Sequence, residues 1–141
     1  MMPIVSAIIT TYKRPIEVVE RAVCSVIAQS FQKIEIIVVD DNPDEWKDKY
    51  RLKELENIFS QNGLRYITYS GNHGACYARN MGLSVARGEY VAFFDDDEWL
   101  QDKIEKQIAR MRDNNIAMVY CSARIINEIN GTISHGKKCV F

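Results

Sequence analysis

Short apolar runs alternate with segments of helical periodicity along this 141-residue chain. Strands are predicted where the apolar residues run almost without a break, at 3–9, 34–41, 64–70, 89–94 and 116–121. Helices are predicted between them, at 15–30, 44–63, 75–88 and 100–115. A nearly unbroken run such as IEIIVVDD is typical of a parallel strand that is covered on both faces. The alternation therefore predicts an α/β fold, a mostly parallel sheet with helices on both faces.

Glycine, proline and asparagine refine the ends of these elements. Pro15 suits the first turn of a helix, and Gly63 and Gly88 are expected to end the second and third helices. After the fifth predicted strand, Asn130-Gly131 stands between two β-rich stretches, which predicts a C-terminal hairpin with a type I′ turn.

Polar residues follow the predicted strands at the ends where parallel sheets bind their ligands. The stretches are TTYKRP after the first strand, DDNPDE after the second, SGNHG after the third and DDDEW after the fourth. Because the carboxyl ends of parallel strands share one edge of the sheet, we expect these four stretches to line one crevice.

The acidic stretch Asp95-Asp96-Asp97 favours a bound cation. Two carboxylates about 4–6 Å apart in a partly desolvated crevice repel by roughly 1–4 kcal/mol, so unpaired acids here would destabilise the free domain. Mg²⁺ or Mn²⁺ prefers carboxylate oxygens and commonly bridges to phosphates. In an extended segment Asp95 and Asp97 share a face. The alternative is a solvated loop that caps the following helix.

Four further residues are candidates for contacts with a nucleotide. Asp41 ends the run VVDD, where a carboxylate can accept hydrogen bonds from a base or a ribose, or form an ordinary turn. Arg14 and Arg79 can pair with a diphosphate, although either alone also suits a surface ion pair. His73, in the loop GNHG, is a weaker candidate.

Composition and absent motifs exclude several classes of protein. The net charge of −1 gives no reason to expect a nucleic-acid partner, and the apolar start of the chain is too short for a signal peptide or a membrane span. There is no G-x-G-x-x-G after the first strand, no P-loop and no nucleophile elbow. The spacing of the four cysteines suits no metal site, so free thiols in a reducing cytosol are expected; they are Cys24, Cys76, Cys121 and Cys139.

In combination, the motifs SAIITTYKRP, VVDDNPDE, GNHGACYARN and FFDDDEW resemble the family 2 glycosyltransferases, inverting enzymes of the GT-A fold. The similarity extends over about residues 4 to 125. It implies transfer of a sugar from a nucleotide-diphosphate sugar, here a UDP-sugar, to a sugar or glycolipid acceptor, with Mn²⁺ or Mg²⁺ as cofactor. We accordingly expect a cytoplasmic location, peripheral to the inner face of the membrane.

The resemblance also implies roles for particular residues. The nucleotide contacts are Thr10, Tyr12, Arg14, Asp41, Arg79 and Asp96. Among them, Asp41 would contact the base, Arg79 the phosphates and Asp96 the ribose. Asp97 would be the principal metal ligand, with Asp95 as a second one.

Members of this family usually continue for roughly another hundred residues, which supply the acceptor half and an aspartate general base. We therefore expect residues 1–141 to form a single nucleotide-sugar-binding domain, the N-terminal part of a longer enzyme. Glu128 lies in a hairpin and is not assigned as the base. One alternative is a non-catalytic nucleotide-binding domain that retains the donor fold. A haloacid-dehalogenase-like phosphohydrolase is disfavoured, because that chemistry needs an aspartate where TTYKRP follows the first strand.

Overall fold

The computed structural model describes residues 4–114, 116–127 and 129–135. The chain divides into two compact units, residues 1–104 and 105–141, which are described in turn.

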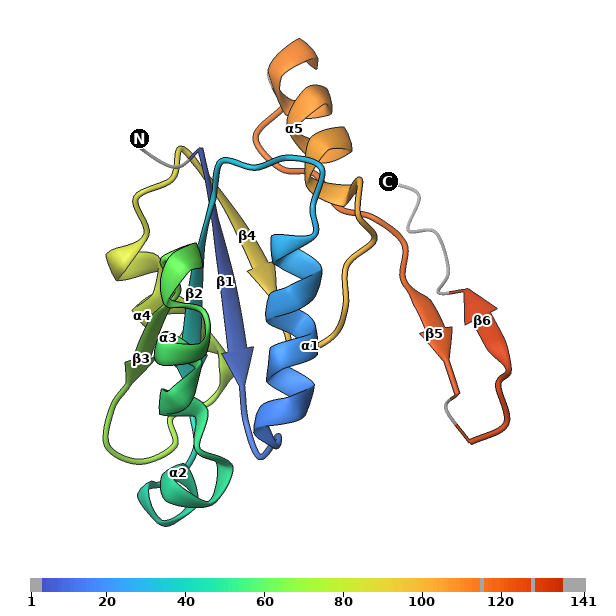
Figure 1. Cartoon of the computed structure of the whole chain (residues 1–141). Helices are drawn as coiled ribbons and strands as arrows, with labels where there is room; N and C mark the ends of the chain where they lie inside the picture. The colour runs from blue at the N-terminus through green and yellow to red at the C-terminus, as the bar shows by residue number, and fades with distance from the viewer. Residues whose placement is uncertain (1–3, 115, 128, 136–141) are drawn as a thin grey trace. The chain divides into compact units, whose positions relative to one another are not determined.

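The first unit is built on a four-stranded parallel sheet with the order β3-β2-β1-β4 (Figure 1). Its strands are β1 (Val5–Thr11), β2 (Ile34–Asp40), β3 (Arg65–Thr68) and β4 (Tyr90–Phe94). The chain steps outward from β1 through β2 to β3 and then crosses to the other side of β1 to form β4. The strand order thus reverses between β1 and β4, the place where open α/β sheets bind their ligands.

Helices cover both faces of this sheet, as the sequence predicts. On one face α1 (Ile16–Ile27) packs Val19 and Val23 against Ala7 and Ile9 of β1. On the other face α4 (Ala75–Val85) packs Ala78 against Ile8, the β1 residue between those two. Figure 1 shows α1 and α3 in front of the sheet and α4 behind it. The α/β fold with helices on both faces is confirmed.

The predicted helix at 44–63 is broken into short pieces. They are α2 (Asp44–Tyr50), the 3-10 turn η1 (Leu52–Glu54), α3 (Leu55–Ile58) and the 3-10 turn η2 (Ser60–Asn62). The break follows from Arg51, whose φ of 53° is left-handed and cannot continue a right-handed helix. Gly63, with a φ of 65°, ends the segment as predicted.

Helix α4 ends at Val85 rather than at Gly88. Gly88 has a different role, because it lies directly against the start of β1. A Cβ at this position would stand 2.6 Å from the backbone nitrogen of Ser6. The glycine therefore allows the connection between α4 and β4 to run against the sheet.

The second unit contains most of α5 (Lys103–Asn114) and the antiparallel strands β5 (Arg124–Ile126) and β6 (Ile133–His135). The predicted C-terminal hairpin is confirmed. The predicted strand at 116–121 is wrong: these residues form no strand in the described structure, and Met118 and Tyr120 are exposed. An apolar run forms a strand only where a neighbouring strand pairs with it, and this run has none among the described residues.

The turn of the hairpin also differs from the predicted type I′ turn. Asn127 and Thr132 pair beyond the strands, with the Asn127 nitrogen 2.9 Å from the Thr132 carbonyl oxygen, so the loop is longer than two residues. A type I′ turn needs a positive φ at both central residues. Gly131 has one, at 69°, and Asn130 does not.

Candidate functional site

The ends of β1 and β4 are joined by side chains of the acidic stretch. The Thr10 hydroxyl donates a hydrogen bond to Asp95 at 3.3 Å, and the Thr11 hydroxyl donates one to Asp96 at 3.1 Å. Because successive residues of a strand point to opposite faces, the two aspartates are held on opposite sides of β1. The acidic stretch is therefore attached to the central strand at the point where the strand order reverses.

Two arginines from other elements reach the same carboxylates. Nε of Arg14, after β1, lies 3.3 Å from Oδ2 of Asp96. Nη2 of Arg79, on α4, lies 3.0 Å from Oδ1 of Asp95. Asp95 and Asp96 are therefore not unpaired, as the predicted repulsion assumed. Both ion pairs are partly exposed, so solvent screens them and another anion can replace either carboxylate at modest cost.

Asp97 is exposed, as Asp95 is, whereas Asp96 is partly buried. Within the described residues no three His, Cys, Asp or Glu side chains are placed to hold a metal ion together. Mg²⁺ and Mn²⁺ sites, however, often use only one or two carboxylates, with water and substrate phosphates as the other ligands. Asp95 and Asp97 carry the carboxylate ligands that sites of this kind use.

Tyr12 lies in the loop after β1 and keeps 45% of its surface exposed. The next residue, Lys13, has a left-handed φ of 52°, and its backbone N–H donates to Oδ1 of Asn42 at 2.6 Å. Its ammonium lies 5.1 Å from the Tyr12 ring centroid and 4.6 Å from that of Trp46. The loop thus presents an open aromatic ring beside a positive charge, which suits a stacked base near phosphates.

Asp41 is 3% exposed, and its carboxylate accepts four hydrogen bonds from the loop between β3 and α4. The donors are the Tyr69 hydroxyl, the Asn72 side-chain amide and the backbone N–H groups of His73 and Gly74, at 2.7–2.9 Å. Burial, and next the hydrogen bond to Asp41, raise the pKa of Tyr69 well above its usual range. Asp41 is therefore built into the structure of this loop.

Asp44 supports the same loop, a role that the sequence analysis missed because its only signal is a place in a polar stretch. Its carboxylate accepts hydrogen bonds from the Ser70 hydroxyl at 2.8 Å and from the Gly71 N–H at 3.2 Å. The Lys47 ammonium, 2.8 Å from Asp44, also donates to the Tyr69 carbonyl. The Lys47 hydrogen bond is the largest of several that lower the pKa of Asp44 to about 2.

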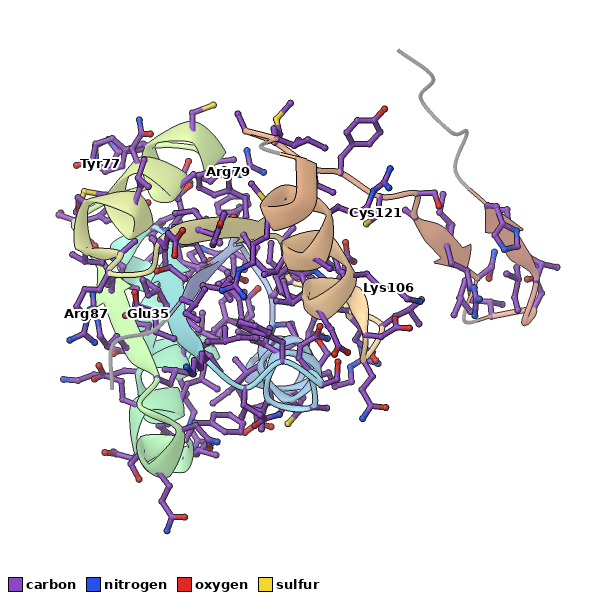
Figure 2. All side chains as sticks on the ribbon, turned by 90° about the horizontal axis from the view of Figure 1, so that it is seen from above. Glu35, Tyr77, Arg79, Arg87, Lys106 and Cys121 are labelled. Carbon is purple, nitrogen blue, oxygen red and sulfur yellow. The ribbon has the colours of Figure 1, made fainter. Side chains whose placement is uncertain are left out.

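His73 packs in an aromatic cluster instead of facing the acidic stretch. Its ring centroid lies 5.6 Å from that of Tyr69 and 4.6 Å from that of Tyr77, and its Nε2 is 3.0 Å from the Ser70 carbonyl. Tyr77 and Arg79 leave α4 on different sides (Figure 2). The aromatic cluster and the arginine therefore belong to different surfaces of the helix.

The structure thus places the predicted residues in two sets at the end of β1: Thr10 and Arg79 contact Asp95, and Arg14 contacts Asp96. Cys24, Cys76 and Cys121 are free thiols, as predicted, while Cys139 and Glu128 lie outside the described residues. Every described helix is too short or too polar to cross a bilayer.

The sequence profile of glycosyl transferase family 2 matches residues 6–139, which is almost the whole chain. The chain belongs to this family. It is 36% identical over 125 residues to an Escherichia coli protein, UDP-Glc:alpha-D-GlcNAc-diphosphoundecaprenol beta-1,3-glucosyltransferase WfgD; the match covers 88% of this chain and 47% of WfgD. It is 38% identical over 120 residues to the putative teichuronic acid biosynthesis glycosyltransferase TuaG of Bacillus subtilis, covering 84% and 46%.

The fold also agrees with that of solved structures. The mannosyltransferase PcManGT of Pyrobaculum calidifontis, solved with GDP-Man and Mn²⁺, superposes with a TM-score of 0.69 at 22% identity, over 82% of this chain and 34% of that one. The chain spans just under half the length of the two relatives named above. The GT-A fold and the family assignment predicted from the sequence are both confirmed.

Proposed function

We propose that this chain is the nucleotide-sugar-binding part of an inverting glycosyltransferase that takes its sugar from a UDP-sugar. The observation that carries the proposal is the pairing of two carboxylates with two arginines at the ends of β1 and β4. A diphosphate can compete for both arginines, and the released carboxylates can then bind the ribose and a divalent ion. Family membership and the UDP-glucose donor in the name of the WfgD relative support this proposal.

Each predicted residue has a role in the proposal. Arg14 and Arg79 hold the diphosphate, and Thr10 keeps Asp95 in place at the strand end. Tyr12 offers its exposed ring to the base, and Asp96 is proposed to contact the ribose.

For Asp41, a position beside the base is proposed. Asp97 and Asp95 provide carboxylate ligands for Mn²⁺ or Mg²⁺, which supplies positive charge to the departing diphosphate when bound.

The acceptor is proposed to be a sugar, either free or carried by a lipid. The lipid diphosphate in the name of the WfgD relative supports the second possibility, which would bring the protein to the inner face of the membrane. Inversion needs a general base on the side of the sugar opposite the leaving group. We assign that base to none of the described residues.

Thermal unfolding with UDP, with and without Mn²⁺, tests the site. At 100 times its dissociation constant, a ligand that binds only the folded state adds about 2.7 kcal/mol of stability, a shift of several degrees. We expect Asp97→Asn to fold normally and to lose most of the Mn²⁺-dependent part of this shift, because an amide is a poor ligand for a hard cation.

Asp48→Asn, the same change at an exposed position on α2, serves as the control and should keep the full shift. If Asp97→Asn kept the full Mn²⁺-dependent shift, Asp97 would not be a metal ligand. If UDP produced no shift in the unmodified chain under either condition, the proposed function would be wrong.

A further inference from the structure

We infer that Asp41 is a positioning residue that orders residues 69–74 and the start of α4. Residues 69–74 are here called the anchor loop. Through this loop and the helix, Asp41 acts on diphosphate binding. This role rests on the function proposed above and goes beyond a contact with the base. Its basis is the set of four hydrogen bonds that the anchor loop donates to one buried carboxylate.

The carboxylate of Asp41 is fully engaged before any ligand binds. Oδ1 accepts from the Tyr69 hydroxyl and the His73 N–H, and Oδ2 accepts from the Asn72 amide and the Gly74 N–H. A carboxylate has about four lone-pair sites, and each of these is used. The Asp41 backbone N–H also donates to the Thr11 carbonyl at 3.1 Å, so the anchor is fixed to β1.

Two glycines bend the anchor loop. Gly71 and Gly74 have φ values of 75° and 88°, so both bends depend on glycine. Gly74 is the N-cap of α4 and provides no side-chain cap for the helix. The negative charge of Asp41 lies beside the Gly74 N–H at the start of α4, where anions stabilise a helix.

Asp44 is a second and weaker support for the same loop. It accepts from Ser70 and Gly71, at the far end of the loop from the helix, and it is exposed. Hydrogen bonds to an exposed carboxylate compete with water, whereas those to buried Asp41 do not. Asp41 is therefore the group on which the order of the loop depends.

The start of α4 connects this anchor to the diphosphate site. Arg79 lies five residues after Gly74, in the second turn of the helix, and reaches Asp95 at 3.0 Å. If the anchor loop is displaced, the first turn of α4 moves with it, and the Arg79 guanidinium shifts relative to the diphosphate site. The effect does not involve the base, so it extends to ligands that have none.

The first measurement is amide hydrogen exchange of the free chain by NMR. In Asp41→Asn we expect exchange at the His73 and Gly74 amides to accelerate at least tenfold, because an amide side chain cannot accept from all four donors. Amides inside β2, such as Ile37, should be unchanged, which separates loop opening from global unfolding. Unchanged exchange at His73 and Gly74 would overturn the anchoring role.

The second measurement compares the dissociation constants of UDP and of inorganic pyrophosphate, both with Mn²⁺. Asp41→Asn should raise both dissociation constants by about the same factor. The expected factor is roughly tenfold, which corresponds to 1.4 kcal/mol. A loss for UDP with none for pyrophosphate would overturn the inference and leave Asp41 as a base contact. Asp48→Asn is the matched control and should change neither constant.

Two variants keep the test valid if Asp41→Asn does not fold. Tyr69→Phe removes one donor to Asp41, and Gly74→Ala strains the loop at a position where a Cβ meets nothing within 4 Å. Each variant should weaken the binding of UDP and of pyrophosphate by the same factor. Unchanged binding of the two ligands in both variants would count against the inference. If the unmodified chain bound neither ligand, the proposed function would fail, while hydrogen exchange would still decide the anchoring role.

Discussion

Replacing Glu35 by glutamine should destabilise the first unit by about 2 kcal/mol. Glu35 on β2 is 7% exposed and accepts hydrogen bonds from the Ser6 hydroxyl at 2.5 Å and from the backbone N–H and Nε of Arg87 at 2.6 and 3.2 Å. Nη1 of Arg65 adds an ion pair at 3.6 Å. Figure 2 shows Glu35 and Arg87 side by side.

The magnitude follows from what glutamine keeps and loses. Its carbonyl oxygen can still accept from Ser6 and from the Arg87 backbone, but its NH₂ group faces the two guanidinium groups without an acceptor. Hydrogen bonds to a charged group contribute about 1.5–3 kcal/mol each. Both arginines are partly exposed, so their pairs with Glu35 are discounted for solvent screening to about 2 kcal/mol together.

The pH dependence gives this prediction a second readout. Burial alone would raise the pKa of Glu35, but the hydrogen bonds from Ser6 and Arg87 and the charge of Arg65 outweigh it and lower the pKa below 4.5. A lowered pKa in the folded state means that the ionised form stabilises the fold above the unfolded pKa, and that this stability is lost as the pH falls through the folded pKa. The difference between wild type and Glu35→Gln should therefore be constant above about pH 5 and shrink below pH 4.5.

Urea unfolding at several pH values measures both effects, and at neutral pH the melting temperature should fall by roughly 5–10 °C. Glu54→Gln is the matched control: Glu54 pairs with Arg51 at 2.6 Å, but on the exposed surface, so loss of this pair should have little effect on stability. A Glu35→Gln effect no larger than that of the control, or one that does not shrink in acid, would refute the reasoning.

Two further predictions concern the backbone and the anchor loop. Gly88→Ala should lower the free energy of unfolding, measured in urea, by about 1–3 kcal/mol. The new Cβ would stand 2.6 Å from the Ser6 backbone nitrogen, which cannot move aside easily. A neutral effect would contradict this close approach. The pKa of Asp44 is lowered to about 2, mainly by the hydrogen bond from Lys47. The ionised carboxylate that accepts from the Gly71 N–H is therefore present above about pH 4 and lost towards pH 2. The exchange protection of the Gly71 amide, corrected for the intrinsic rate, should fall over that range in wild type but not in Asp44→Asn.

The sequence alone determined the fold class and the edge of the sheet where the site lies. Unbroken apolar runs that alternate with helical periodicity permit few arrangements other than a parallel sheet with covered faces, and polar strand ends mark its binding edge. The elements that were predicted wrongly depend on contacts that a local pattern does not contain. The run at 116–121 has the composition of a strand but no strand to pair with, and the break at Arg51 is a single left-handed residue inside a favourable helical pattern.

Within the candidate site, the sequence determined which residue types are present, and the tertiary structure decided their partners. Three adjacent aspartates predict repulsion, but two of them pair with arginines from elsewhere in the chain. Arg79 lies sixteen residues before Asp95, and Arg14 follows the neighbouring strand β1. Asp41 suggested a ligand contact, and folding surrounds it with four donors from a loop about thirty residues away. The physical reason is that the energy of a charge depends on its neighbours in space, and those neighbours are set by strand order and chain crossings.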